Sequence, residues 1–288
     1  MLLSEAFETY RQDVIVFSGQ SPKTEENHNI CLRALLVFFG DTQIESLNLQ
    51  MVRDWKLELE KHRATDTVRN YVVRFRVVLA HCQKLGLPVI DYTLIPVPKR
   101  ADRVPTFVSP EDVQKLIDHC LMNGNARKIN RIRNAAMISL LYASGLRVSE
   151  LCALNRDELR DGKFTVVGKG KKARLCFYDV RSMRYIDQYL ALRTDNNPAL
   201  FTADSNGLRI TPGGVQEVFK NATRAAGFTK PIHPHIMRHS YATNLMQNGM
   251  HIYQLKELMG HSNISTTQVY LHVTDPQLQE SYEQYHTI

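Results

Sequence analysis

Apolar residues in the first third of the chain recur every three or four positions, the spacing of one face of an α-helix. In the first such segment, residues 3–19, they stand at Leu3, Phe7, Tyr10, Val14 and Phe17. The same spacing predicts helices over residues 3–19, 22–40, 49–62 and 65–85. Ser21 and Pro22 supply an N-cap and a first-turn proline for the second helix, and Gly86 a stop for the fourth.

A proline-rich stretch then interrupts the helical pattern. It contains Pro88, Pro96, Pro98 and Pro105, together with basic residues. Because proline lacks an N–H and disfavours helix in the residue before it, this stretch predicts an extended linker. Ser109-Pro110-Glu111-Asp112 opens a new helix with a cap, a proline and early acids. We expect an N-terminal domain over residues 1–98, a basic linker over 99–108 and a second domain over 109–288.

The second domain is helical with one β interruption. Residues 164–167 and 174–178 predict two strands, joined by a turn that contains Gly168-Lys169-Gly170. Helical patterns resume over residues 180–192, 214–226, 234–248 and 253–259. The fold class is therefore mainly α with a small β-sheet.

Composition excludes several classes of protein. Hydrophobic residues make up 43% and charged residues 23% of the 288 residues, as in ordinary globular proteins. The longest nearly apolar run, residues 135–146, is too short to span a membrane, and the N-terminus has no signal-peptide pattern. We therefore expect a cytoplasmic protein. The five cysteines are scattered and never form a Cys-x-x-Cys pair, so we expect buried thiols rather than disulfides or zinc ligands.

The net positive charge of the chain lies entirely in its later part. The whole sequence carries a net charge of +7, with about −1 in residues 1–98 and +8 in residues 99–288. A basic domain suits a polyanionic partner. Arg69, Arg74 and Arg76 also give the fourth helix a basic face, which either contacts DNA phosphates or is an ordinary solvated face.

Four short motifs carry the candidate chemistry. In order they are residues 143–151 (Ala-Ser-Gly-Leu-Arg-Val-Ser-Glu-Leu), the Gly168-Lys169-Gly170 turn, residues 234–240 (Pro-His-Ile-Met-Arg-His-Ser) and residues 259–270. Together they resemble the catalytic domain of the tyrosine recombinases, in particular the Xer-type recombinases and related integrases. The resemblance covers residues 109–288 by motif. It implies an α+β catalytic domain preceded by a helical core-binding domain of the SAM-like type.

The residue types fit the cleavage of a phosphodiester. That reaction needs a nucleophile, positive charge around the non-bridging oxygens and a proton donor for the leaving oxygen. Tyr270 is the candidate nucleophile, and a tyrosine packed in a core is the alternative. Arg147 and Arg238 are candidates to clamp the phosphate, because guanidinium groups match its oxygens in two-pronged geometry. Glu150 shares a helical face with Arg147 and is expected to orient it.

Histidines surround these candidates. His235 and Arg238 lie three residues apart on one helix face, so both can reach one phosphate. The resemblance implies that His235 handles protons, including that of Tyr270, and that His261 hydrogen-bonds a non-bridging oxygen. Zinc ligation by His233, His235, His239 and His261 is the alternative, but neither thiolates nor a His-Glu-x-x-His pattern supports it.

A lysine at the turn between the strands is ordinarily just solvated. The resemblance makes Lys169 the general acid that protonates the 5′-oxygen, with Lys171 and Lys172 as nearby rivals. These two lysines, with Lys99 and Arg100 of the linker and the three arginines of the fourth helix, are further candidates to bind DNA.

The function implied is site-specific recombination. Tyr270 would form a 3′-phosphotyrosyl bond, and exchange would proceed through a Holliday junction without metal or other cofactor. The partner would be a double-stranded site with inverted repeats, on two of which a tetramer assembles. The apolar stripe of Leu278, Tyr282 and Tyr285 would dock on a neighbouring protomer or pack on its own domain. Integration, transposon resolution and chromosome-dimer resolution all fit this chemistry.

Two other functions compete with this one. A catalytically silent DNA-binding protein would not need the full set Arg147, Lys169, His235, Arg238, His261 and Tyr270. A type IB topoisomerase-like enzyme would nick and close DNA without exchanging strands, and the separate helical domain and apolar tail speak against it.

Overall fold

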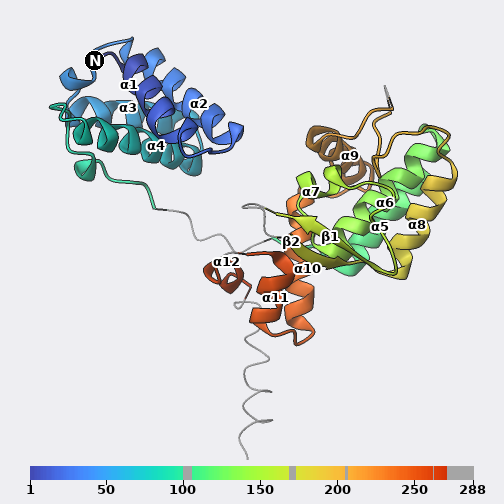
Figure 1. The fold of residues 1–288 in the computed structure, drawn as a ribbon. Coiled ribbons are helices and arrows are strands. Elements are labelled where there is room, and N and C mark those ends of the chain that lie inside the picture. Colours follow the sequence, from blue (N-terminus) through green and yellow to red (C-terminus); the bar gives the residue numbers. More distant parts are fainter. Residues whose placement is uncertain (100–105, 169–172, 205–206, 262, 271–288) are drawn as a thin grey trace, which may run out of the picture. The chain divides into compact units, whose positions relative to one another are not determined.

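The computed structural model of the chain describes residues 1–99, 106–168, 173–204, 207–261 and 263–270. The chain divides into two compact units, Met1–Arg103 and Val104–Ile288, and each has its own hydrophobic core (Figure 1). The division between them lies inside residues 99–108, the stretch in which the sequence places a linker.

The first unit is a set of packed helices. Its elements are α1 (Leu3–Tyr10), the π-helical turn η1 (Arg11–Val16), α2 (Pro22–Phe39), the 3-10 turn η2 (Ile44–Ser46), α3 (Leu49–His62), α4 (Thr65–Lys84) and the 3-10 turn η3 (Tyr92–Leu94). The core of this unit contains Trp55 and Phe75, whose rings meet edge to face with centroids 5.8 Å apart. At the start of α2, the Ser21 side chain accepts a hydrogen bond from the Thr24 N–H, which confirms the expected cap.

The first helix departs from the expectation of one regular helix over residues 3–19. At η1 the backbone widens, and the Phe17 N–H donates to the Gln12 carbonyl five residues back. The extra residue in this turn shifts the phase of the helix. Ile15 is therefore buried, while Phe17, which the regular spacing assigned to the apolar face, is 89% exposed.

The second unit packs around one central helix. Its elements are α5 (Pro110–Met122), α6 (Lys128–Ser144), α7 (Val148–Ala153), β1 (Lys163–Val167), β2 (Ala173–Phe177), α8 (Val180–Ala191), α9 (Pro212–Ala225), α10 (Pro234–Gln247), α11 (Ile252–Met259) and α12 (Ser265–Gln268). The central helix is α6, against which α5, α8 and α10 pack (Figure 1). The run Ala135–Leu141 is buried throughout, because α6 has neighbours on several sides.

The two strands form an antiparallel hairpin, as predicted. Phe164 pairs with Cys176 and Val166 with Arg174. These four side chains point inward, while their neighbours along each strand are exposed. The fold class, mainly α with a small sheet, is thereby confirmed.

The segment that carries Tyr270 begins with the short helix α12. Its N-cap is Ile264, and the Asn263 side chain accepts a hydrogen bond of 3.0 Å from the Ser265 N–H. Tyr270 stands two residues beyond Gln268, in a turn closed by its own N–H donating to the Thr267 carbonyl over 3.1 Å.

All five cysteines are free and buried, and the burial agrees with the expectation. Among the residues that the structure describes, no helix has the length and apolar character needed to cross a membrane.

Candidate active site

The junction between α6 and α7 places Arg147. Gly145 ends α6 in the left-handed conformation, with φ at 61°, and a Cβ there would collide with the Tyr241 ring. Arg147 follows as the N-cap of α7 in extended conformation. Its backbone N–H donates to Glu150 Oε2 over 2.7 Å, and its Nη1 donates to Glu150 Oε1 over 2.9 Å. Glu150 thus holds both the backbone and the side chain of Arg147.

A second arginine, not singled out by the sequence, also binds Glu150. Arg174 of β2 donates from Nη1 and Nη2 to the two carboxylate oxygens, each over 2.7 Å. Burial alone would raise the pKa of the Glu150 carboxyl, but hydrogen bonds from Arg174 and Arg147 outweigh it and lower that pKa to about 2. The carboxylate is therefore charged at neutral pH and balances one of the two arginines.

Arg238 of α10 is held between two turns of the backbone. Its Nη1 donates to the Gly145 carbonyl and its Nη2 to the Met259 carbonyl, at the ends of α6 and α11. The side chain is buried, and burial together with the nearby charges of Arg147 and Arg174 lowers its pKa to about 10. It remains protonated at neutral pH. The three arginines and Glu150 form a cluster with an excess of positive charge.

His261 adjoins this cluster from the end of α11. Gly260, in the left-handed conformation, turns the chain so that His261 Nε2 lies 3.2 Å from Arg238 Nη2. The Nδ1 atom lies 2.9 Å from the Thr267 hydroxyl. Burial, with Arg238 next in weight, lowers the pKa of His261 to about 4, so the ring is neutral at neutral pH. In this arrangement Nε2 accepts from Arg238 and Nδ1–H donates to Thr267.

Tyr270 lies in a small apolar cluster beside the arginines. Its ring is 2% exposed and packs with Ala242, Met246, Leu255 and Met259. Burial raises the pKa of the phenol, and the charge of Arg238 opposes that rise. The oxygen lies 2.8 Å from His239 Nδ1.

His239, rather than His235, is therefore the partner of Tyr270 in this structure. Burial, then His235 and Arg238, lower the pKa of His239, so the neutral ring accepts a hydrogen bond from the phenol. His235 is exposed, one turn earlier on α10. The sequence contains one signal for this contact, the i, i+4 spacing of the two histidines, but that spacing does not say which ring faces the tyrosine.

His235 lines a groove that also contains Val148, the residue that follows Arg147. The groove has a volume of about 850 Å³ and is lined by residues of α9 and α10, including the exposed Lys220 and Arg224. Within the described residues, no three or more His, Cys, Asp or Glu side chains are grouped so as to hold a metal ion.

Several predicted residues lie outside the described residues. They are Lys169, Lys171 and Lys172, which belong to the connection between β1 and β2, Arg100 of the linker, and the apolar tail with Leu278, Tyr282 and Tyr285.

In the first unit, two of the basic residues of α4 have contacts within that unit. Arg69 Nη1 donates to the Pro98 carbonyl over 2.8 Å, and the Arg76 guanidinium lies 5.6 Å from the centre of the Tyr92 ring. Arg74 is half-buried, and its charge contributes to the lowered pKa of His28. Lys99 is exposed. For all four residues, DNA contact stays a prediction.

Comparison with known proteins identifies the family. The model of the phage integrase family matches residues 106–277. The tyrosine recombinase XerD of Oceanobacillus iheyensis is 37% identical over 200 residues, which are 67% of this chain and 66% of that protein. The tyrosine recombinase XerC of Myxococcus xanthus is 31% identical over 99% of this chain and 98% of its own length.

Solved structures share the fold. The Tn1549 transposon integrase in complex with transposon right end DNA matches with a TM-score of 0.80 at 18% identity, covering 99% of each chain. XerH recombinase bound to palindromic difH substrate matches with a TM-score of 0.75 at 19% identity, covering 97% of this chain and 82% of that one. The chain belongs to the phage integrase family, as a tyrosine recombinase of the Xer type. This confirms the resemblance drawn from the four motifs.

Proposed function

We propose that this protein is a site-specific DNA recombinase that cuts and rejoins DNA through a 3′-phosphotyrosyl intermediate. The observation that carries this proposal is the convergence of Arg147, Arg238, His261 and Tyr270. They come from α7, α10, the end of α11 and the turn after α12, and the contacts described above join them into one site.

The arginines supply the charge that phosphoryl transfer needs. Arg147 and Arg238 would bind the non-bridging oxygens of the scissile phosphate, where negative charge is greatest in the transition state. Arg238 is already fixed by two backbone carbonyls, so little reorganisation accompanies the reaction. His261 would donate to a phosphate oxygen in its other tautomer, with Nε2 protonated and Nδ1 accepting from the Thr267 hydroxyl.

The covalent step balances with groups of this chain. The Tyr270 oxygen attacks phosphorus, an O–P bond to the phenol forms, and the bond between phosphorus and the 5′-oxygen breaks. The phenolic proton passes to a histidine, and the leaving 5′-oxygen takes a proton from Lys169. A 5′-hydroxyl of the partner strand then reverses the step on the other duplex. Each step exchanges one phosphoester bond for another, so the bond energy is kept in the covalent intermediate and no cofactor is required.

Tyr270 is not ready to attack in the state described. It is buried, protonated and hydrogen-bonded to His239, and its pKa lies above the ordinary value. The phenol must leave His239 and reach a phosphate held by the arginines. There, two guanidinium charges would favour the phenolate, and the exposed His235 would lie at the mouth of the groove to handle the proton.

The partner proposed is double-stranded DNA with inverted repeats. The groove that His235 lines carries Lys220 and Arg224, which suit the phosphate backbone, and the basic part of the chain is the catalytic unit. The first unit would serve as the core-binding domain, with Arg69, Arg74, Arg76, Lys99 and Arg100 as candidate contacts. Two sites would be brought together by a tetramer. We also propose a cytoplasmic location, because the substrate would be chromosomal or element DNA.

Replacing Tyr270 by phenylalanine tests the proposal. The probe is a duplex recovered by binding selection from a random pool and nicked near its centre, so that a cleaved strand is trapped on the protein. Tyr270→Phe removes one oxygen and keeps the ring, so the variant should fold and bind this duplex. Covalent adducts, measured by denaturing gel, should disappear.

Tyr253→Phe is the matched control. Tyr253 is 62% exposed on α11, so its substitution should leave adduct formation unchanged. An adduct that persists in Tyr270→Phe and maps to another side chain would contradict the mechanism. Relaxation of supercoiled DNA without exchange between two sites would instead indicate a topoisomerase.

A further inference from the structure

Arg174 occupies a position in β2 that ordinarily belongs to an apolar residue. The inward-facing residues of the hairpin include Phe164, Val166 and Cys176, and Arg174 is directly opposite Val166. The flanking Leu175 is 45% exposed. The strand therefore exposes a leucine and buries an arginine. Burying a charge is costly unless it is paired. The contacts of Arg174 must therefore compensate for its burial.

All three nitrogens of the guanidinium have partners in the second unit. Nη1 and Nη2 bind the Glu150 carboxylate in a two-pronged pair, and Nε donates to the Leu258 carbonyl over 3.1 Å. The aliphatic stem passes over Gly260, where an added Cβ would lie only 2.8 Å from Arg174 Cδ. With its donors engaged in this way, Arg174 is not poised to bind a phosphate itself.

These contacts join three segments that carry the proposed site. Glu150 holds the backbone and side chain of Arg147 on α7. The end of α11 offers the Met259 carbonyl to Arg238 and leads directly into His261. Arg174 itself is the second residue of β2, five residues after Lys169 in the sequence. One side chain thus links the segments of both proposed phosphate-binding arginines and the hairpin.

Arg174 also sets how strongly Glu150 attracts Arg147. With both arginines present, one carboxylate is shared between two cations. Without Arg174, the whole charge of Glu150 would act on Arg147, drawing it away from a phosphate and neutralising it. The positive excess of the cluster would fall at the place where the reaction needs it.

We propose that Arg174 is a positioning residue for DNA cleavage. It acts through Glu150 and the Leu258 carbonyl to hold Arg147 and the Arg238–His261 pair close enough together to bind the same phosphate. This proposal rests on the proposed function. It requires the planar fork of arginine, because an ammonium group cannot make the two-pronged pair and the third bond together.

Adduct formation on the nicked duplex tests this role in Arg174→Met, Arg174→Lys and Glu150→Gln. Displacing a catalytic group by about 1 Å can lower the reaction rate on the order of 100-fold. We therefore expect the rate of adduct formation to fall by about that factor in Arg174→Met. Arg174→Lys should recover only part of it. Because Arg174 acts through Glu150, the double variant Arg174→Met/Glu150→Gln should be no slower than the slower single variant.

A duplex with a methylphosphonate at the scissile position gives a readout that a loss of stability would not change. A methylphosphonate carries one negative charge fewer than a phosphodiester, so its cleavage depends less on the arginine cations. The loss in Arg174→Met should therefore shrink to about 10-fold or less on this duplex, because the defect lies in charge placement.

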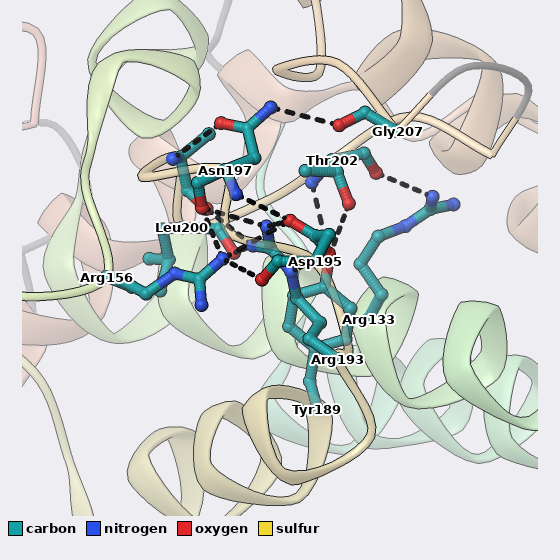
Figure 2. A network of polar contacts seen from close by, with 10 residues as sticks. Arg133, Arg156, Tyr189, Arg193, Asp195, Asn197, Leu200, Thr202 and Gly207 are labelled. Atoms are coloured by element: carbon teal, nitrogen blue, oxygen red, sulfur yellow. Dashed lines mark hydrogen bonds and ion pairs between the residues drawn. The ribbon is translucent and has the colours of Figure 1, made fainter.

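Arg193→Met is the matched control, since Arg193 is equally buried but belongs to another network. Figure 2 shows it binding Asp195 and the carbonyls of Asn197 and Leu200, which are not part of the proposed site. Arg193→Met should lower the melting temperature without a selective loss of cleavage on phosphodiester DNA. All rates are measured at a temperature where each variant is folded and binds the duplex.

Three results would overturn the role of Arg174: full activity of Arg174→Lys, additive losses in the double variant, or equal losses on both duplexes. If wild-type protein forms an adduct that Tyr270→Phe lacks, and one of these results is also found, only this inference fails. If Tyr270→Phe still forms the adduct, the proposed function fails first.

Discussion

The contribution of the Glu150 carboxylate to the stability of the fold depends on pH. Its hydrogen bonds to Arg174 and Arg147 hold its pKa at about 2, against an ordinary value of 4.5. A depressed pKa means that the stabilising contribution is fully present above 4.5 and is lost as the pH falls toward 2. Acid should therefore loosen the arginine cluster by protonating this one group.

We predict that Glu150→Gln lowers the free energy of unfolding by roughly 3 kcal/mol at neutral pH, as the pKa shift implies. The difference from the wild type should shrink as the pH falls from 4.5 to 2. Urea unfolding at a series of pH values measures it. Glu217→Gln is the control, because Glu217 is exposed and its pair with Lys220 is long, at 3.4 Å. A difference that does not depend on pH would contradict the assignment.

At the scale of elements, glycines at two helix ends turn the chain so that residues of the candidate site follow directly. Gly145 ends α6 before Arg147, and Gly260 ends α11 before His261, both in the left-handed conformation. Gly249, which follows α10, has a similar φ of 84°, but a Cβ added there would meet nothing within 4 Å. Substitutions at Gly249 and Gly260 therefore separate two effects on stability: the strain of the left-handed conformation, which both share, and a steric collision, which only Gly260 has.

We predict that Gly260→Ala is more harmful than Gly249→Ala. Each should lose about 1 kcal/mol of stability because alanine resists the left-handed conformation. Only Gly260→Ala also forces its Cβ against Arg174, which displaces His261. Thermal unfolding should show the larger shift for Gly260→Ala, and adduct formation should fall in that variant alone. Equal effects in the two variants would mean that Arg174 yields freely.

The elements themselves could largely be predicted from local signals. Ser21-Pro22 and Ser109-Pro110 mark helix starts through their own side chains, and both serine caps are formed. The phase shift at η1 escaped prediction, because the regular spacing of Val14 and Phe17 satisfies a helix equally well. Arg174 escaped because its partners lie 24 and 84 residues away, on α7 and α11. Contacts of that range leave no mark in a local pattern.

The site residues divide in the same way. The family motifs led to Arg147, Glu150, Arg238, His261 and Tyr270, and the structure brings these five together. The contact of Tyr270 with His239 depends on how α10 faces the turn after α12, where Tyr270 packs in the apolar cluster that contains Met246 and Leu255. A sequence motif names residue types, whereas tertiary packing decides which of two neighbouring rings meets the phenol.

At the scale of the whole molecule, we expect the tail beyond residue 270 to contribute to assembly. Its apolar stripe of Leu278, Tyr282 and Tyr285 lies outside the described residues. We predict that deleting residues 275–288 leaves binding to one DNA site intact and lowers both the pairing of two sites and recombination. Gel shifts with one-site and two-site duplexes, together with a recombination assay, measure these effects.

A triple substitution of Leu278, Tyr282 and Tyr285 by serine is the matched control, because it keeps the length of the tail. It should reproduce the defect of the deletion if the apolar stripe is responsible. Recombination at the wild-type rate by the truncated protein would mean that the tail does not link protomers.

The burial of all five cysteines also has a practical consequence. Burial raises the pKa of Cys120 to about 12 and that of Cys152 to about 11, so almost no thiolate forms at neutral pH. Maleimide dyes should therefore not react with the native thiols of the folded protein. A cysteine introduced at the exposed Phe17 could then carry a fluorophore without a cysteine-free background, which makes single-molecule observation of strand exchange feasible with the natural core intact.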